Sequence, residues 1–349
     1  MKFALKILIV GGLLVGCAPE KSSQETSQES TPSTSVNVYT HRHYESDQQL
    51  FERFEEVTGI EVNVINASAD ELINRMELEG EASPADVLIT VDAGRLHRAK
   101  EKGLLQVADS EILEANVPAK FRDPEKHWFG ITYRARIIAY SLDRVDPTTI
   151  TTYETLTEPQ WANKVLIRSS SNIYNQSLLA SIIASQGTSQ AKSWASGVKE
   201  NMAREPKGND RDQVKAVAAG LGDVAVLNTY YIGKLLDSDD QEEVGAGESI
   251  GIIFPNQEGR GTHVNISGVA MAKYAPNPEN ALKFIEFLSS DEAQMVFAET
   301  NFEYPVKPGV AWAPLLTSWG EFNTDTLNLA LLGKHNKEAV MIFDEVGWK

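Results

Sequence analysis

Two spacings of apolar residues alternate along the first part of the chain. In three short runs, apolar residues either alternate with polar ones or follow each other directly. This pattern predicts strands at residues 36–39, 60–65 and 86–91. Between them apolar residues recur every three or four positions, which predicts helices near 46–59, 70–79 and 93–102. Strands and helices that alternate in this order predict an α/β fold with parallel sheets.

A second strand–helix series follows, and two long extended stretches separate it from the first. The extended stretches cover residues 128–141 and 250–271, the latter interrupted by a glycine-rich turn at 259–261. The second series predicts strands at 164–168 and 223–227 and helices at 175–185, 210–219, 278–288, 291–299 and within 325–345. This pattern predicts two lobes joined by two hinge crossover strands, with a ligand site between the lobes that closes by hinge motion.

The predicted lobes are each discontinuous in sequence. The chain is expected to cross to the second lobe near residue 137 and to return near 260. Lobe one is therefore expected to contain residues 36–136 plus 261–311, and lobe two residues 137–260 plus 312–349.

The N-terminus has the features of a processing segment. Residues 1–16 contain two lysines and a short apolar core that cannot span a bilayer, and they lead into Leu14-Val15-Gly16-Cys17, which resembles a bacterial lipoprotein signal. Cys17 is the only cysteine, so intrachain disulfides and cysteine-based zinc sites are excluded. Residues 17–35 are rich in Ser, Thr, Gln and Glu and predict a flexible tether behind a lipidated Cys17. We expect a cell-envelope protein anchored by lipid, with its globular part outside the cytoplasm.

The chain is strongly acidic. Its 349 residues carry a formal net charge of −17, which argues against nucleic acid as a partner because phosphates are bound by basic faces. The charge is compatible with a cationic ligand. Solubility alone also explains an acidic surface, and the sequence leaves both readings open.

Four tyrosines follow the predicted strands at the point where each strand ends. Tyr44 follows the first strand, Tyr174 follows the strand at 164–168, and Tyr230 and Tyr231 follow the strand at 223–227. Ligands of open α/β sheets bind beyond the carboxyl ends of strands. Tyr230 and Tyr231 are adjacent, so they can share a ligand only from a turn or the first turn of a helix. For each tyrosine taken singly, ordinary packing stays the alternative.

The chemistry of four phenols narrows the ligand. A free phenol ionises near pH 10, so keeping one ionised at pH 7 costs roughly 4 kcal/mol, and only a highly charged ion offsets that cost for four. Ferric iron fits a site of hard oxygen donors. Four phenolates on Fe³⁺ leave a charge of −1, which Arg134, in the predicted hinge, is placed to balance. The alternative for Arg134 is a surface or interlobe ion pair.

The segments around these tyrosines resemble the ferric-ion-binding proteins of bacterial ABC importers. The similar segments are Ser-Ser-Ser-Asn-Ile-Tyr-Asn at 169–175, Leu-Asn-Thr-Tyr-Tyr at 227–231 and His-Arg-His-Tyr at 41–44, and the likeness, strongest to the cyanobacterial Fut-type branch, extends over residues 36–349. The resemblance implies a type II periplasmic-binding-protein fold that carries Fe³⁺ as its transported ligand. It also implies the following site residues: Tyr44, Tyr174, Tyr230 and Tyr231 as tyrosinate ligands, His43 at a position that is a ligand in some members and a bystander in others, and Arg134 beside the ligands.

The same resemblance implies the partners. The loaded protein, a monomer, would dock on an ABC permease and its ATPase in the inner membrane, and a synergistic anion or a water could complete the iron site. The lipoprotein signal departs from the soluble form of many relatives and implies work close to a membrane.

Three other readings remain at the level of sequence. The same fold could carry another cargo, such as a polyamine, a sugar or an anion; the chain could be a metal-dependent envelope hydrolase; or it could be a structural lipoprotein without a ligand. A hydrolase needs a positioned base and an open metal position, and no residue has a convincing context for that base, so we expect no enzyme. The acidic run 239–243 is expected to be a solvated loop.

Overall fold

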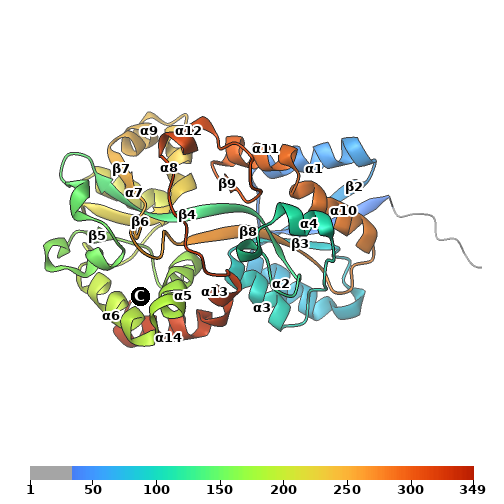
Figure 1. The fold of residues 1–349 in the computed structure, drawn as a ribbon, viewed down its shortest axis with the longest axis horizontal. Helices are drawn as coiled ribbons and strands as arrows, with labels where there is room; N and C mark the ends of the chain where they lie inside the picture. The colour runs from blue at the N-terminus through green and yellow to red at the C-terminus, as the bar shows by residue number, and fades with distance from the viewer. Residues whose placement is uncertain (1–33) are drawn as a thin grey trace, which may run out of the picture. The chain divides into compact units, whose positions relative to one another are not determined.

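Nine strands form one continuous sheet path in the computed structural model, which describes residues 34–349 (Figure 1). The order is β2-β1-β3-β8-β4-β6-β5, and β7 and β9 also pair with β4. The strands are β1 (Ser35–Thr40), β2 (Glu61–Asn66), β3 (Val87–Val91), β4 (Phe129–Ser141), β5 (Val165–Leu166), β6 (Val224–Asn228), β7 (Ile250–Ile253), β8 (Val264–Met271) and β9 (Tyr304–Pro305). The predicted signal peptide, Cys17 and nearly all of the predicted tether lie outside the described residues, and β1 begins at Ser35, the last residue assigned to that tether.

The long strand β4 belongs to both halves of the sheet. Its first part, from Phe129 to Ala135, pairs antiparallel with β8, and its second part, from Arg136 onward, pairs with β6 and β7. The parallel pairs β1–β2, β1–β3 and β5–β6 lie on either side of it. We call the half that contains β1, β2, β3 and β8 lobe one, and the half that contains β5, β6 and β7 lobe two. The segment between β7 and β8 makes the second crossing, so the two predicted crossover connections are present.

Helices cover both faces of each half of the sheet (Figure 1). Around lobe one lie α1 (Glu45–Thr58), α2 (Ala69–Glu79), α3 (Ala93–Glu101), α4 (Glu111–Asn116), α10 (Pro278–Leu288) and α11 (Asp291–Asn301). Around lobe two lie α5 (Ile173–Gln186), α6 (Thr188–Glu200), α7 (Asp210–Ala218), α8 (Thr229–Leu236), α9 (Gln241–Glu248), α12 (Pro314–Ser318) and α14 (Asn336–Val346). Helix α13 (Ala330–Lys334) packs against both α3 and α5, so it touches both lobes. Within residues 34–349, no helix has the length and apolar character that crossing a membrane requires.

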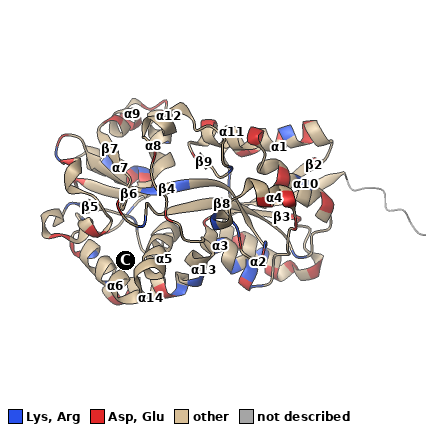
Figure 2. Cartoon of the chain, in the orientation of Figure 1, with Lys and Arg blue, Asp and Glu red and all other residues tan. Residues whose placement is uncertain are grey.

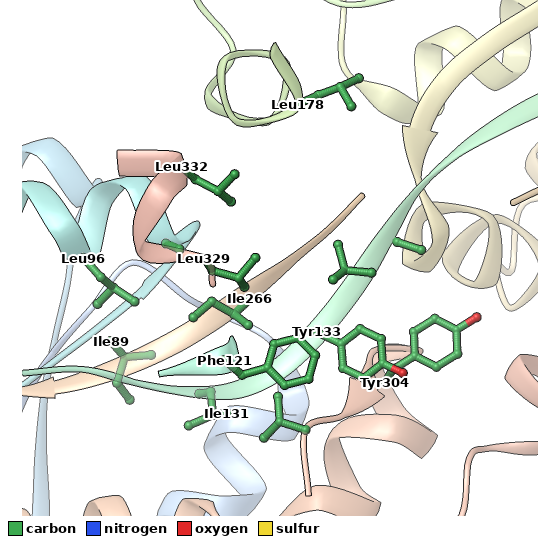
Figure 3. Close-up of a cluster of buried hydrophobic side chains, with 14 of the residues drawn as sticks. Ile89, Leu96, Phe121, Ile131, Tyr133, Leu178, Ile266, Tyr304, Leu329 and Leu332 are labelled. Carbon is green, nitrogen blue, oxygen red and sulfur yellow. The ribbon is translucent and has the colours of Figure 1, made fainter. Parts of the chain in front are cut away.

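The apolar core runs from one lobe into the other. Figure 3 shows part of it, where Ile89 of β3, Ile131 of β4 and Ile266 of β8 lie on the sheet of lobe one and Leu332 of α13 lies near them. Leu178 of α5 belongs to the same cluster. Burial of such side chains stabilises the fold by roughly 1.5–3 kcal/mol each, so the core holds α13 and α5 beside lobe one.

Three sequence expectations were wrong in detail. The acidic run 239–243 is not a solvated loop but the start of α9, because the Asp240 side chain accepts a hydrogen bond from the Glu242 amide and acidic residues stabilise a helix N-terminus. The strand expected at 164–168 is reduced to Val165–Leu166, since Lys164 still belongs to the turn after Trp161, where its amide donates to Trp161 O. The last helices begin at 330 rather than 325, because Asp325 N donates to Thr262 O and holds that segment extended.

Candidate metal centre

The four predicted tyrosines all lie at the N-terminal ends of helices. Tyr44 is the N-cap residue of α1, after β1, and Tyr174 is the second residue of α5, where the Asn172 side chain accepts a hydrogen bond from its amide. Tyr230 and Tyr231 are the second and third residues of α8, directly after β6. The tandem pair therefore occupies a first helical turn, as sharing a ligand requires. A helix N-terminus carries partial positive charge, which favours a phenolate over a phenol.

The structure brings these four side chains together. The phenol oxygens of Tyr174 and Tyr230 are 3.4 Å apart, and the rings of Tyr230 and Tyr231 have centroids 4.2 Å apart. Tyr44 reaches the same cluster from lobe one, close enough to Tyr174 and Tyr230 for both to affect its ionisation. Tyr230 is buried and the other three are partly accessible. The cluster thus joins one phenol from lobe one to three from lobe two.

Ionising these phenols is unfavourable without a cation. Burial is the main cause that raises the pKa of Tyr44, Tyr230 and Tyr231, and electrostatic repulsion from Tyr174 is the second cause for each of them. The interaction with Tyr230 is a smaller effect that lowers the pKa of Tyr44 and Tyr231. A group that binds here must therefore supply enough positive charge to displace several protons.

Cationic side chains surround two of the tyrosine rings. The guanidinium carbons of Arg134, Arg136 and Arg168 lie 5.4, 5.9 and 5.9 Å from the centroid of the Tyr174 ring. Arg42 and Lys234 lie 4.8 and 4.3 Å from that of Tyr44. Figure 2 shows the basic residues of β4 between the two lobes. Sequence reasoning named only Arg134 among these five, although Lys234 lies one helical turn after Tyr230 and Arg136 lies on the same face of β4 as Arg134.

Arg134 is buried with part of its hydrogen-bonding capacity unused. Its Nη1 donates to Ser267 Oγ at 3.5 Å, whereas its Nε and Nη2 find no acceptor within residues 34–349. Its positive charge lowers the pKa of Tyr230. A buried cation with free donors beside a phenol is suited to stabilise a phenolate once one forms.

A buried network of charged side chains holds the segment that leads into α1. Arg42 donates from Nε to Asp47 at 3.0 Å and from Nη1 to Glu303 at 2.9 Å, and all three side chains are buried. Asp47 lies in the first turn of α1 and also accepts from the Tyr44 amide at 3.4 Å. The network therefore holds Tyr44 in place, and a buried pair of this kind is costly to break.

His43 is placed differently from the tyrosines. Its ring stacks on Tyr44 with centroids 5.5 Å apart, and its side chain is exposed. The part of the chain that the structure describes has no cluster of three His, Cys, Asp or Glu side chains that could hold a metal. Phenol oxygens are thus the donors that this centre offers.

A two-lobed α/β fold with a ligand site built from both lobes defines a solute-binding protein of the type II periplasmic class. The chain belongs to the bacterial extracellular solute-binding protein family, whose model matches residues 82–318. Iron uptake protein A1 of Synechocystis sp. is 48% identical over 348 residues, which cover 99% of this chain and 96% of that protein.

Solved structures give the same result. The structure titled Trichodesmium (IdiA) (FutA) in complex with iron and citrate ligands matches with a TM-score of 0.88 and 50% identity, over 90% of this chain and 100% of that one. The ferric binding protein from Campylobacter jejuni matches with a TM-score of 0.86 and 46% identity, over 90% and 100%. The predicted family and fold class are confirmed, as is the expectation of a binding protein rather than an enzyme.

Proposed function

We propose that this chain is the extracytoplasmic Fe³⁺-binding component of an ABC-type importer and that Tyr44, Tyr174, Tyr230 and Tyr231 hold the ion as tyrosinates. The observation that carries the proposal is the convergence of four phenols from two lobes on one point, with the Tyr174 and Tyr230 oxygens 3.4 Å apart. The names of its relatives support iron as the cargo: an iron uptake protein, a ferric binding protein and a structure with bound iron and citrate.

Charge explains why a trivalent ion suits these donors. Four phenolates carry −4, and Fe³⁺ reduces this to −1 at a point that the positive ends of α1, α5 and α8 and a nearby cation can stabilise. Arg134 supplies that cation and its free donors. A divalent ion would leave −2 and offset the cost of ionising the phenols less well, so reduction of the iron would favour its release.

The delivery step follows from the two lobes. Residues 36–136 with 261–311 and residues 137–260 with 312–349 move as two bodies about β4 and the β7–β8 connection, and opening at a membrane permease and its ATPase exposes the ion. Lipid on Cys17 keeps this monomer within reach of that permease. An anion or a water completes the coordination, and His43 stands beside the ligands without binding the ion.

Visible absorbance tests the proposal directly. Purified protein mixed with ferric citrate is expected to develop a phenolate-to-iron band, and Tyr230→Phe is expected to weaken or shift it. Tyr133→Phe is the matched control, because Tyr133 is a buried tyrosine whose ring stacks between Phe121 and Tyr304 in the core (Figure 3). No band in the wild type, or a band that Tyr230→Phe leaves unchanged, would overturn the tyrosinate site.

A further inference from the structure

A hydrogen bond between the two lobes lies one helical turn from the metal centre. Ser177 of α5 places its Oγ 2.8 Å from both carboxylate oxygens of Asp92, which stands at the end of β3 and caps α3. Ser177 follows Tyr174 by three residues on the same helix. Both Ser177 and Asp92 are fully buried. The contact therefore joins the helix that carries Tyr174 to the lobe that carries Tyr44.

Asp92 is also hydrogen-bonded to β8, the strand of lobe one that pairs with the crossover strand β4. Its Oδ2 accepts from Asn265 Nδ2 at 2.8 Å, and its backbone amide donates to Ile266 O at 2.8 Å, both on β8. Asn265 pairs directly with Arg134 across the β4–β8 ladder. The remaining acceptor capacity of Asp92 is taken by the Gly94 amide at 2.8 Å and by Ser177. One carboxylate thus links β8 and α3 of lobe one to α5 of lobe two.

The backbone of Asp92 is held in a conformation that residues with a side chain rarely adopt. Its φ is +81° and its ψ is 120°. Such a conformation persists only where the surroundings over-determine it, and in folded proteins it gathers at functional and switching sites. Here it directs the carboxylate to Asn265 and Ser177 at the same time.

The surrounding contacts leave little space for a different arrangement. A Cβ at Gly94 would lie 3.0 Å from Asp92 Oδ1 and 3.8 Å from Ser177 Oγ, so the first turn of α3 closely approaches α5. Helix α13 packs against α3 and α5, and Leu178, the residue after Ser177, belongs to the apolar cluster of Figure 3. In this arrangement Asp92 is fully buried, and the Ser177 hydroxyl is one of the donors to its carboxylate.

We propose that Asp92 and Ser177 are positioning residues that act through lobe closure: their hydrogen bond fixes Tyr174 relative to Tyr44 and so holds the four-phenol site assembled. This inference rests on the proposed function, because iron binding is the event that closure serves. Neither residue touches the ion. The bond acts only when the lobes are together, so it should slow release of the ion without changing the ligands.

Ser177→Ala is the test, with Ser181→Ala as its matched control. Ser181 lies one turn further along α5, is equally buried, and donates to Leu178 O within its own helix. Ser177→Ala is expected to release iron to a competing chelator about tenfold faster, with an unchanged visible band, whereas Ser181→Ala stays within about twofold of the wild type.

The Tyr44→Phe background separates positioning from simple destabilisation. Without the Tyr44 oxygen, lobe one brings no ligand to the ion, so Ser177→Ala should change release by less than about twofold there. Equal acceleration in both backgrounds, or no difference between Ser177→Ala and Ser181→Ala, would overturn the positioning role while the iron site stands. Absence of a band in the wild type would instead refute the proposed function, and this role with it.

Discussion

Arg134, which is buried, and Arg260, which is partly buried, have almost the same relation to a tyrosine ring, yet only Arg134 borders the four-phenol site. The guanidinium of Arg134 lies 5.4 Å from the Tyr174 ring, and that of Arg260 lies 5.4 Å from the Tyr153 ring. We expect Arg134→Gln to weaken iron binding by roughly 30-fold, about 2 kcal/mol, because a desolvated cation stabilises the negative complex. Competition titration against citrate measures this change.

Arg260→Gln is the control for that substitution. Arg260 also has an Nε and an Nη2 without a hydrogen bond in residues 34–349, but its Nη2 lies 3.6 Å from a carboxylate oxygen of Glu154, and Tyr153 does not belong to the site. The variant should lose stability without losing iron affinity once both are measured at a temperature where it is folded. If both arginine variants weaken binding equally, the effect of Arg134 comes from the fold and not from its charge.

His43 provides a second test at the level of single residues. Its ring is exposed and stacks on Tyr44, so we expect His43→Ala to leave the position of the visible band unchanged and to lower the affinity for iron by less than about fivefold. Absorbance and competition titration on the same sample measure both quantities. A band shift as large as that of Tyr44→Phe would instead make His43 a ligand.

For single residues, the sequence predicts the four tyrosines of the site better than it predicts the cationic side chains around them. The tyrosines could be found because residues at the carboxyl ends of strands in an α/β sheet converge. The cations over their rings could not, except by helical or strand spacing from a known site residue. Arg168 lies over the ring of Tyr174, and Lys234 lies over that of Tyr44. The two residues of each pair belong to different elements, so no local sequence pattern predicts their contact. Nothing in the sequence connects Asp92 with Ser177, and only the fold brings the two side chains together.

Helix α8 depends on a glycine to approach lobe one. A Cβ at Gly233 would lie 2.5 Å from Phe302 Cγ, at the end of α11. Gly233→Ala therefore forces this interlobe contact apart, and we expect about tenfold weaker iron binding, within the 1–3 kcal/mol range typical of overpacking. Competition titration measures the affinity, and small-angle scattering of the iron-loaded variant should show a larger radius of gyration than the wild type.

Gly245 is the matched helical glycine. It is exposed in α9, and an added Cβ meets nothing within 4 Å. Gly245→Ala should raise the free energy of unfolding by roughly 0.5–1 kcal/mol, because alanine loses less backbone entropy than glycine in a helix, and it should leave iron affinity unchanged. If Gly233→Ala behaves like Gly245→Ala, the contact with Phe302 has no part in closure.

Helices and strands could be predicted where the spacing of apolar residues is regular over many positions. Strands β4 and β8 and helices α7, α10 and α11 lie close to where the apolar spacing places them. Failures occurred where local chemistry or pairing decides the outcome. Helix α9 depends on its Asp240 cap, and β5 has only two residues because the turn after Trp161, in which the Lys164 amide donates to Trp161 O, runs up to its first residue.

At the scale of the whole molecule, the two extended stretches are the informative feature of the sequence. An extended segment of thirteen residues is longer than one lobe needs, and β4 indeed pairs first in lobe one and then in lobe two. The sequence does not predict how closely the two lobes come together. That depends on contacts such as Ser177 to Asp92 and Gly233 to Phe302, each of which joins residues distant in sequence.

Binding by the whole molecule should release protons. A phenol ordinarily ionises near pH 10, and burial raises the pKa of Tyr44, Tyr230 and Tyr231 further, so the metal-free site holds its protons at pH 7. Each phenol that binds Fe³⁺ must lose one. We expect about four protons per ion, and about three for Tyr230→Phe, measured by calorimetry in buffers of different ionisation enthalpy after subtraction of the protons that citrate exchanges.

The sign of the pH dependence follows from that release. The free protein binds more protons than the loaded protein, so the apparent affinity rises with pH over the whole range below the phenol pKa values and falls as pH falls. The increase in melting temperature that iron gives must follow the same direction, since a ligand at free concentration c stabilises the folded state by RT ln(1 + c/Kd), which grows with its affinity. That increase should therefore shrink from pH 8 to pH 6 in the wild type. It should shrink less steeply in Tyr230→Phe, because one fewer proton competes with the ion. An increase that does not vary with pH would mean that iron binds without displacing phenol protons, and the four tyrosines would then lose their role as ligands.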